Sequence, residues 1–504
     1  MIEVEVHQQL YAFLREQRQP HWPHHLTMAR LVARALRLER SALMQTGTQE
    51  HYRLSYLMPL LLWPGPAMIV ATAAVQQWLL MVEIPQLQQW IQTPKPMLQS
   101  DRWPDPTFEG LLLTTPEIWL LDRITGLGKF PAGILTILDG VDDLEDWTRC
   151  ALTLDLHPQD WHHLTLAHPP LLEVIRETQI QLTRSVFHHP PNPYECHLIS
   201  PGEREILNYL YNRLQEVLPL HTPPLWRQFW QQWQLSTSLT WMTIARPSGQ
   251  FSLHTAPSDV ADVLGTVWSQ QPVILIGNAL DLEAEATLYR QRIGIRDLTC
   301  LKFAPDRQQE LIQLYLPDHL PMPNTPQFQP ALLQEIRQML ALRAVTLDLT
   351  VIVVGDMPLK AQLATVLAAE FGSRVQVEKT SLEPNGILVT GWEFWQQYQG
   401  QLPAPRLLAI ATLPIPSLEN PLVAGRVAYY KRSHQDWFRL YLLPTALSTL
   451  QRAIAPVRSQ QGTVALFDSR VLHRSYGKQV LTALSPLARI NYLESGVRFS
   501  SLLD

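Results

Sequence analysis

The chain has 504 residues, of which 46% are hydrophobic and 17% charged, so it is long enough for two to four domains with a large buried core. This composition excludes an intrinsically disordered chain. The formal net charge of −5 excludes a general basic coat, so nucleic-acid binding would require a local basic patch.

The three cysteines, Cys150, Cys196 and Cys300, lie far apart, and no two of them have the spacing of metal ligands. Three thiols are too few for the usual four ligands of an iron–sulfur cluster, so we expect no such cluster. Isolated thiols are typical of a reducing cytosol, and we expect a cytoplasmic protein. The first residues do not resemble a signal peptide. Prolines and glutamines interrupt the apolar segment 57–81, so no membrane span is expected.

Short apolar runs alternate with helical patterns on both sides of a central segment. The runs lack polar alternation, which is typical of strands buried on both faces of a parallel sheet. The expected strands span residues 67–71, 111–114, 134–138, 273–276, 350–354, 387–389, 407–411 and 464–467. Helical patterns between them, as in residues 359–371, indicate β-α-β units.

The central segment, residues 151–237, is rich in His, Pro, Trp and Gln and has helical patterns. Ser200, with Glu203 three residues later, predicts the capped start of a helix. An aromatic stripe with helical spacing consists of Trp226, Phe229, Trp230 and Trp233. Bases could stack on such a stripe, but a packed core is the commoner role of these residues, and we favour it.

We therefore predict an α/β protein with two parallel-sheet domains and a helical insertion in the first. The first domain spans residues 1–150 and returns in residues 238–330, after the insertion at 151–237. The second domain spans residues 331–504, and the proline-rich segment 317–330 is the predicted linker.

Motifs in a consistent order carry a resemblance to a known family. Asp468 ends an apolar run, Arg470 follows, and Tyr476-Gly477 closes the segment. This pattern resembles the end of the second motor domain in DinG/XPD (Rad3-like) superfamily 2 DNA helicases. Residues 316–324 similarly resemble the family motif v-P-x-d-L-P-x-P-N. The resemblance covers most of the chain outside the insertion. It implies two tandem RecA-like (P-loop NTPase-type) domains that close on ATP and step along single-stranded DNA.

The segment 46–59 is similar to the family's phosphate-binding loop, A-G-T-G-T-G-K-T-L-A-Y-L-L-P. Gly47 and Thr48 match its start, whereas Tyr52 stands in place of the lysine and Arg53 in place of the magnesium-binding Ser/Thr. Phosphate binding requires glycines, whose N–H groups close on the anion, and a lysine for the β/γ oxygens. The glycines after Gly47 are also replaced in this chain.

The resemblance assigns the hydrolytic positions to four residues, which are Asp139, Asp142, Gln451 and Arg458. Asp139 matches the magnesium-holding carboxylate of D-E-A-H, but Gly140 replaces the glutamate that orients the attacking water. Asp142 and Asp143 lie nearby in another register. In the last motif, Q-x-x-G-R-x-x-R, Ile454 and Ala455 replace the inner Gly-Arg.

Arg458 has two readings from the sequence. It either stabilises a transition state, as an arginine finger worth ~10³–10⁵ in rate does, or forms a structural ion pair with Asp468 or another carboxylate. For nucleic acid, the resemblance assigns Thr72 and Gln76 to a strand-contacting motif, and Phe394 and Trp395 to the motif F-W-E-G-x-D.

The main hypothesis is a DinG/XPD-like protein that binds single-stranded or branched DNA, with ATP hydrolysis lost or much weakened. One alternative is an active ATP-dependent helicase with a divergent site, in which Arg53 replaces the lysine and Asp142 or Asp143 replaces the base. Another is a protein-interaction scaffold without DNA affinity. ATP and Mg²⁺, the latter held by Asp139, are the cofactors that the resemblance implies, and the replaced residues argue against both.

Overall fold

The computed structural model describes residues 2–17, 22–47, 52–92, 95–216, 222–307, 309–342 and 348–491. Its first domain, called lobe 1 here, is built on a seven-stranded parallel sheet with the order β11-β1-β10-β5-β2-β4-β3. These strands are β1 (Ala42–Gln45), β2 (Ala67–Val70), β3 (Met97–Gln99), β4 (Leu111–Thr114), β5 (Thr136–Asp139), β10 (Val273–Gly277) and β11 (Thr299–Lys302).

Both faces of this sheet are covered, which explains the uninterrupted apolar runs. One face packs against α1 (Ile2–Gln17), α2 (His25–Leu38), α3 (Leu54–Leu62) and α5 (Ile84–Ile91). The other packs against α6 (Pro116–Thr125), α7 (Leu144–Leu152), α12 (Ala261–Trp268) and α13 (Thr287–Arg292). Successive residues of β2 alternate between the two cores, with Met68 on one face and Ile69 on the other.

The second domain, lobe 2, has another seven-stranded parallel sheet, with the order β14-β15-β13-β16-β17-β12-β18. Its strands are β12 (Ile312–Tyr315), β13 (Thr350–Val353), β14 (Val375–Val377), β15 (Ile387–Thr390), β16 (Leu407–Ile410), β17 (Thr463–Leu466) and β18 (Leu487–Ile490). Helices α14 (Phe328–Leu342) and α15 (Met357–Phe371) pack on one face. Helices α16 (Trp392–Tyr398), α18 (Leu443–Ser459) and α20 (Gly477–Leu484) pack on the other. The prediction of two parallel-sheet α/β domains is confirmed.

The chain enters lobe 2 earlier than predicted. Strand β12 pairs with β17 and β18 of the second sheet, although it precedes the proline-rich segment 317–330 that was predicted as the linker. Within β12, Ile312 and Leu314 are buried while Gln313 is exposed. Because Gln313 interrupts the apolar pattern, β12 did not stand out as one of the uninterrupted apolar runs from which strands were predicted.

The insertion between the two halves of lobe 1 contains a sheet as well as the predicted helices. Its helices are α8 (Pro158–Ala167), α9 (Leu172–His188), α10 (Pro201–Glu216) and α11 (Pro224–Trp233). They pack on an antiparallel sheet of β6 (Leu154–Leu156), β9 (Gln250–Pro257), β8 (Ser238–Ala245) and β7 (Cys196–Leu198), in that order. The aromatic stripe of α11 is buried in this core, as favoured from the sequence.

Strands β8 and β9 correct the predicted boundary at residue 238. They form a hairpin within the insertion, rather than the return into lobe 1. The turn carries Gly249 with φ of +66°, and β8 alternates buried and half-buried residues. A period of two is typical of a sheet with one face on the core, whereas the prediction followed unalternating runs.

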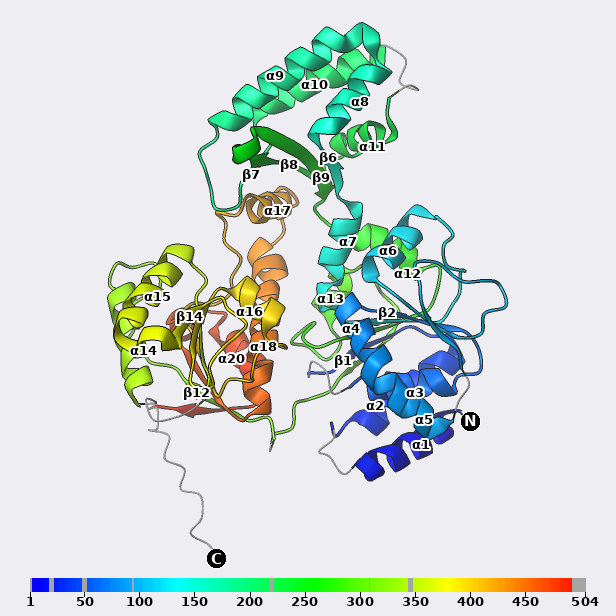
Figure 1. Cartoon of the computed structure of the whole chain (residues 1–504), viewed down its shortest axis with the longest axis vertical. Coiled ribbons are helices and arrows are strands. Elements are labelled where there is room, and N and C mark those ends of the chain that lie inside the picture. Colours follow the sequence, from blue (N-terminus) through cyan, green and yellow to red (C-terminus); the bar gives the residue numbers. More distant parts are fainter. Residues whose placement is uncertain are drawn as a thin grey trace, which may run out of the picture.

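The two lobes lie side by side, with the insertion above the space between them (Figure 1). Helix α17 (Pro421–Arg432) of lobe 2 reaches the insertion, where it packs on β7 and β8. A Cβ atom on Gly425 would lie 2.3 Å from Leu239 Cδ1 and 3.3 Å from Leu198 Cδ2, so any larger residue there would displace the Leu239 side chain. Among the described residues, no helix is both long and apolar enough to span a membrane.

Lys95 provides a stability test within lobe 1. Its buried ammonium donates hydrogen bonds to the carbonyls of Leu60 (2.9 Å), Trp63 (2.7 Å) and Gly65 (2.8 Å), at the end of α3. We expect Lys95→Met to lower the free energy of unfolding by about 2–3 kcal/mol, because buried carbonyls lose a charged donor. Denaturant unfolding measures this. The control Lys129→Met, at a half-exposed pair with Asp101, should change stability by less than about 1 kcal/mol. Equal effects of the two substitutions would contradict the expectation.

Candidate functional site

The candidate site lies at the carboxyl ends of β1, β5 and β10, on the edge of lobe 1 that faces lobe 2. Gly47 follows β1 with φ of +68°, and its N–H donates to the carbonyl of Asn278 at 3.3 Å. The Thr46 hydroxyl donates to Asn278 Oδ1 at 2.9 Å. Thr48 lies outside the described residues. The loop after β1 is thus joined to the loop after β10 by polar contacts of the chain itself.

Asp139, at the end of β5, is buried, and side chains of the chain itself satisfy both of its carboxylate oxygens. The Tyr52 hydroxyl donates to Oδ1, and the Tyr56 hydroxyl donates to Oδ2 at 2.7 Å. Arg53 Nε lies 3.5 Å from Oδ2, and both of these charged side chains are buried. The residue that replaces the lysine therefore points at the carboxylate rather than toward a ligand.

Electrostatics reinforce this arrangement. Burial raises the pKa of both Tyr52 and Tyr56 well above the usual phenol value, and the charge of Asp139 adds to the effect. Both phenols therefore stay protonated and act as donors. The pKa of Arg53 is also raised: burial opposes its charge, but Asp139 and the tyrosines outweigh that effect. Arg53 is thus a permanent counter-cation for Asp139.

The donor set around Asp139 does not fit Mg²⁺. Mg²⁺ requires oxygen ligands in octahedral geometry at about 2.0–2.1 Å. Here the carboxylate oxygens accept from phenols, and a guanidinium supplies the positive charge. Within the part of the chain that the structure describes, no cluster of three or more His, Cys, Asp or Glu residues is arranged to hold a metal.

Asp142 and Asp143 have separate structural contacts. Asp142 accepts from the backbone N–H groups of Asn278 (2.8 Å) and Ala279 (2.7 Å), so it holds the loop after β10. Asp143 accepts from Arg452 of α18, which crosses from lobe 2. Both carboxylate oxygens of Asp142 therefore accept hydrogen bonds from the backbone. Asp142 is poorly placed to act as the general base in place of the glutamate that Gly140 replaces.

Backbone carbonyls, rather than a carboxylate, bind the Arg458 side chain. It is buried, and its guanidinium donates to the carbonyls of Glu310 (2.9 Å), Leu484 (2.8 Å) and Pro486 (3.3 Å). Burial lowers the pKa of Arg458 to about 10. The ion pair expected with Asp468 is wrong, because Asp468 instead pairs with Arg470 at 2.5 Å and accepts from the N–H of Leu413.

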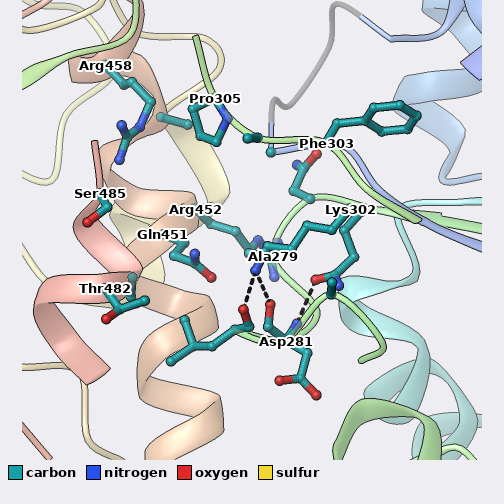
Figure 2. A pocket seen from close by; sticks show the side chains of 18 residues that line it. Ala279, Asp281, Lys302, Phe303, Pro305, Gln451, Arg452, Arg458, Thr482 and Ser485 are labelled. Carbon is teal, nitrogen blue, oxygen red and sulfur yellow. Dashed lines mark hydrogen bonds between the residues drawn. The ribbon is translucent and has the colours of Figure 1, made fainter. Parts of the chain in front are cut away.

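A cavity of about 340 Å³ lies between the lobes beside the candidate site. Lys302 of lobe 1 and Gln451, Thr482 and Ser485 of lobe 2 line it, whereas the ring of Phe303 points away from lobe 2 (Figure 2). The Lys302 ammonium donates to the carbonyls of Asp281 (2.7 Å) and Leu282 (2.8 Å). Gln451 thus lines the cavity, and backbone carbonyls hold Lys302, the lysine on its other side.

Two of the four predicted nucleic-acid residues have internal contacts. Gln76 is fully buried, and its amide donates to the carbonyl of Ala71 at 2.7 Å. Trp395 is also fully buried, and its indole donates to the carbonyl of Ala453 at 3.0 Å. Thr72 and Phe394 are half-buried and remain partly accessible.

Sequence reasoning missed two residues of this site, Tyr56 and Arg452. Tyr56 stands in the Tyr-Leu-x-Pro end of the motif, where it was taken as a structural position. Arg452 directly follows Gln451 in the chain, and this adjacency to a predicted site residue was the sequence signal that could have indicated it. Neither contact can be derived from spacing, because the partners Asp139 and Asp143 lie 83 and 309 residues away in the chain.

The paired parallel sheets and the cleft between them define a class, the proteins with two RecA-like lobes in tandem. Solved structures of that class cover nearly the whole chain. "XPD_Helicase" matches with a TM-score of 0.58 and 11% identity, covering 93% of this chain and 99% of that chain. "Structure of S. tokodaii Xpd4" matches with a TM-score of 0.60 and 12% identity, covering 93% and 99%.

Sequence comparisons find more specific similarities within this class. Residues 385–487 match the helicase C-terminal domain. A protein named ATP-dependent DNA helicase YoaA, from Haemophilus influenzae, is 25% identical over 263 residues, which is 50% of this chain and 41% of that protein. Its Escherichia coli namesake is 24% identical over 271 residues, 51% and 42%. The chain matches about two fifths of the length of these relatives. The chain is thus similar to DinG/XPD-like superfamily 2 helicases, as its motifs indicated.

Removal of the Asp139 charge should destabilise lobe 1. We expect Asp139→Asn to lower the free energy of unfolding by about 3–5 kcal/mol, because the buried Arg53 loses its counter-ion. Denaturant unfolding followed by tryptophan fluorescence measures the change. The double variant Asp139→Asn/Arg53→Met, which removes both charges, should recover part of the loss. A neutral effect of the single substitution would contradict the ion pair.

The two phenols predict a dependence on alkaline pH. Unfolded tyrosines lose their protons near pH 10, whereas Tyr52 and Tyr56 keep theirs in the folded chain. The unfolded state then binds fewer protons, so the free energy of unfolding should fall as the pH rises above about 10. Denaturant unfolding at several pH values measures the slope. The variant Tyr52→Phe/Tyr56→Phe should show a shallower slope, and an unchanged slope would refute the assignment.

Proposed function

We propose that this chain is a nucleic-acid-binding member of the DinG/XPD-like family in which ATP hydrolysis is lost or much weakened. The single observation that carries the proposal is the closed site at Asp139, with Tyr52, Arg53 and Tyr56 as its partners. A hydrolytic site of this type needs a cation between carboxylate and phosphate. In this chain a guanidinium and two phenols take that place.

The other side of the cleft supports the same proposal. An arginine finger must keep its N–H groups available for the transferring phosphoryl group. Both terminal nitrogens of Arg458 already donate to backbone carbonyls, in three hydrogen bonds. The inner arginine position of the motif is Ala455, which lines the cavity and has no charge. An active helicase with a divergent site would need Arg53 and Asp142 to leave the contacts described above.

Nucleic-acid binding is supported by the names of the two relatives, both DNA helicases, and by a local basic patch. This patch consists of the exposed residues Lys431, Arg432, His434 and Arg439, at the end of α17 and just beyond it. Lys431 Nζ lies 5.3 Å from the centre of the Trp437 ring. Such a patch provides the local charge that the net charge of −5 does not. Single-stranded or branched DNA is the proposed partner.

The test of hydrolysis is ATP turnover by the purified full chain, with and without single-stranded DNA. We expect no DNA-stimulated turnover. Stimulated turnover of about 1 s⁻¹ or more by the unmodified chain would overturn the proposal.

The test of DNA binding is a fluorescence titration of single-stranded oligothymidine at several salt concentrations. Affinity should fall with salt with a log–log slope of about −0.7 for each phosphate contacted. Lys431→Glu/Arg432→Glu should weaken binding by about 10-fold or more at low salt. The control Arg30→Glu/Arg34→Glu, which changes two exposed arginines of α2, should leave the affinity nearly unchanged. The absence of any binding by the unmodified chain would favour the scaffold without DNA affinity.

A further inference from the structure

An ion pair crosses the cleft between the two lobes. Arg452 Nη1 lies 2.6 Å from Asp143 Oδ1, and Nη2 lies 3.1 Å from Oδ2. Arg452 belongs to α18 of lobe 2, and Asp143 ends the short helix Val141–Asp143 that follows β5 in lobe 1. Two parallel N–H···O bonds fix direction as well as distance, so this contact specifies one relative orientation of the lobes.

Both ends of the pair rest on rigid supports. In lobe 1, the preceding residue, Asp142, accepts two backbone hydrogen bonds from the loop after β10. In lobe 2, the carbonyl of the following residue, Ala453, accepts from the buried indole of Trp395. The backbone next to each charged residue is therefore fixed by hydrogen bonds within its own lobe, and the pair joins two anchored segments of the chain.

In an active motor of this class, the bound triphosphate supplies negative charge that arginines of the second lobe meet. In this chain the negative charge belongs to Asp143 of lobe 1, and the arginine is Arg452. We infer that this ion pair is a built-in latch that holds the cleft closed without nucleotide. The inference rests on the proposed loss of hydrolysis and adds how the cleft is regulated.

A second contact supports the closed arrangement. Helix α17 of lobe 2 packs on the insertion, which begins and ends in lobe 1, and Gly425 fits closely against Leu198 and Leu239. Lobe 2 is thus held from two sides, by charge at the cleft and by apolar packing at the insertion. The ion pair is the part that salt can weaken, because 41% of the Asp143 side chain is exposed.

The experiment is small-angle X-ray scattering of the full chain in the absence of nucleotide. At low salt, we expect Asp143→Arg and Arg452→Asp each to increase the radius of gyration. The double variant Asp143→Arg/Arg452→Asp, which restores the pair with its charges exchanged, should return the value to that of the unmodified chain. For the unmodified chain, the radius should also increase at about 1 M NaCl, where the screening length is about 3 Å.

The matched control is Asp101→Arg. Asp101 is exposed on lobe 1 and pairs with Lys129, so this substitution changes the net charge as much as Asp143→Arg does and leaves the ion pair between the lobes in place. Its radius should equal that of the unmodified chain. Unchanged radii in both single variants, or failure of the double variant to restore the closed value, would overturn the latch. These arms contain no nucleotide, so ATP turnover, which tests the proposed function, is decided separately.

Discussion

The buried charge of Asp139 is the constraint on which the candidate site depends. A carboxylate removed from water costs several kcal/mol unless a counter-charge and hydrogen bonds accompany it. Here both come from one stretch of chain, since Tyr52, Arg53 and Tyr56 follow one another at the start of α3. The loop after β1 and the end of β5 are thereby joined, and the centre of lobe 1 is complete without any ligand.

The sequence contained most of the fold. Buried parallel strands appear as uninterrupted apolar runs, and the motif order identified the family because Pro, Leu, Trp and Tyr-Gly positions hold loops and helix packing in place. The strands β8, β9 and β12, which were misplaced, share alternating or interrupted patterns. Such patterns arise where only one face of a strand meets the core or where a strand is short, and they resemble loop sequence. The strands β1, β3, β11, β14 and β18 were not predicted, and β1 was missed although all four of its residues are buried.

The site was only partly predictable. The replacement of the lysine and the glutamate could be recognised from the sequence, since the family motif defines which residue is expected at each position. The contacts that the replacing residues make could not be predicted from the sequence, because their partners come from other strands and from the other lobe. Spacing alone does not distinguish a Tyr52 side chain that faces solvent or a ligand from one that is buried against another strand. Only the folded chain shows that it points at Asp139 and that Arg452 reaches Asp143.

The position of Arg53 bears on how such a site evolves. A lysine restored at position 52 would meet a guanidinium already seated on the carboxylate, so two like charges would compete for one partner. Recovery of phosphate chemistry would therefore require several coordinated changes, at positions 52, 53 and 56 and in the missing glycines. Each intermediate would carry an unbalanced buried charge or a phenol without its acceptor. Under the proposed loss of hydrolysis, the stability of the fold therefore opposes a stepwise return to a lysine at position 52.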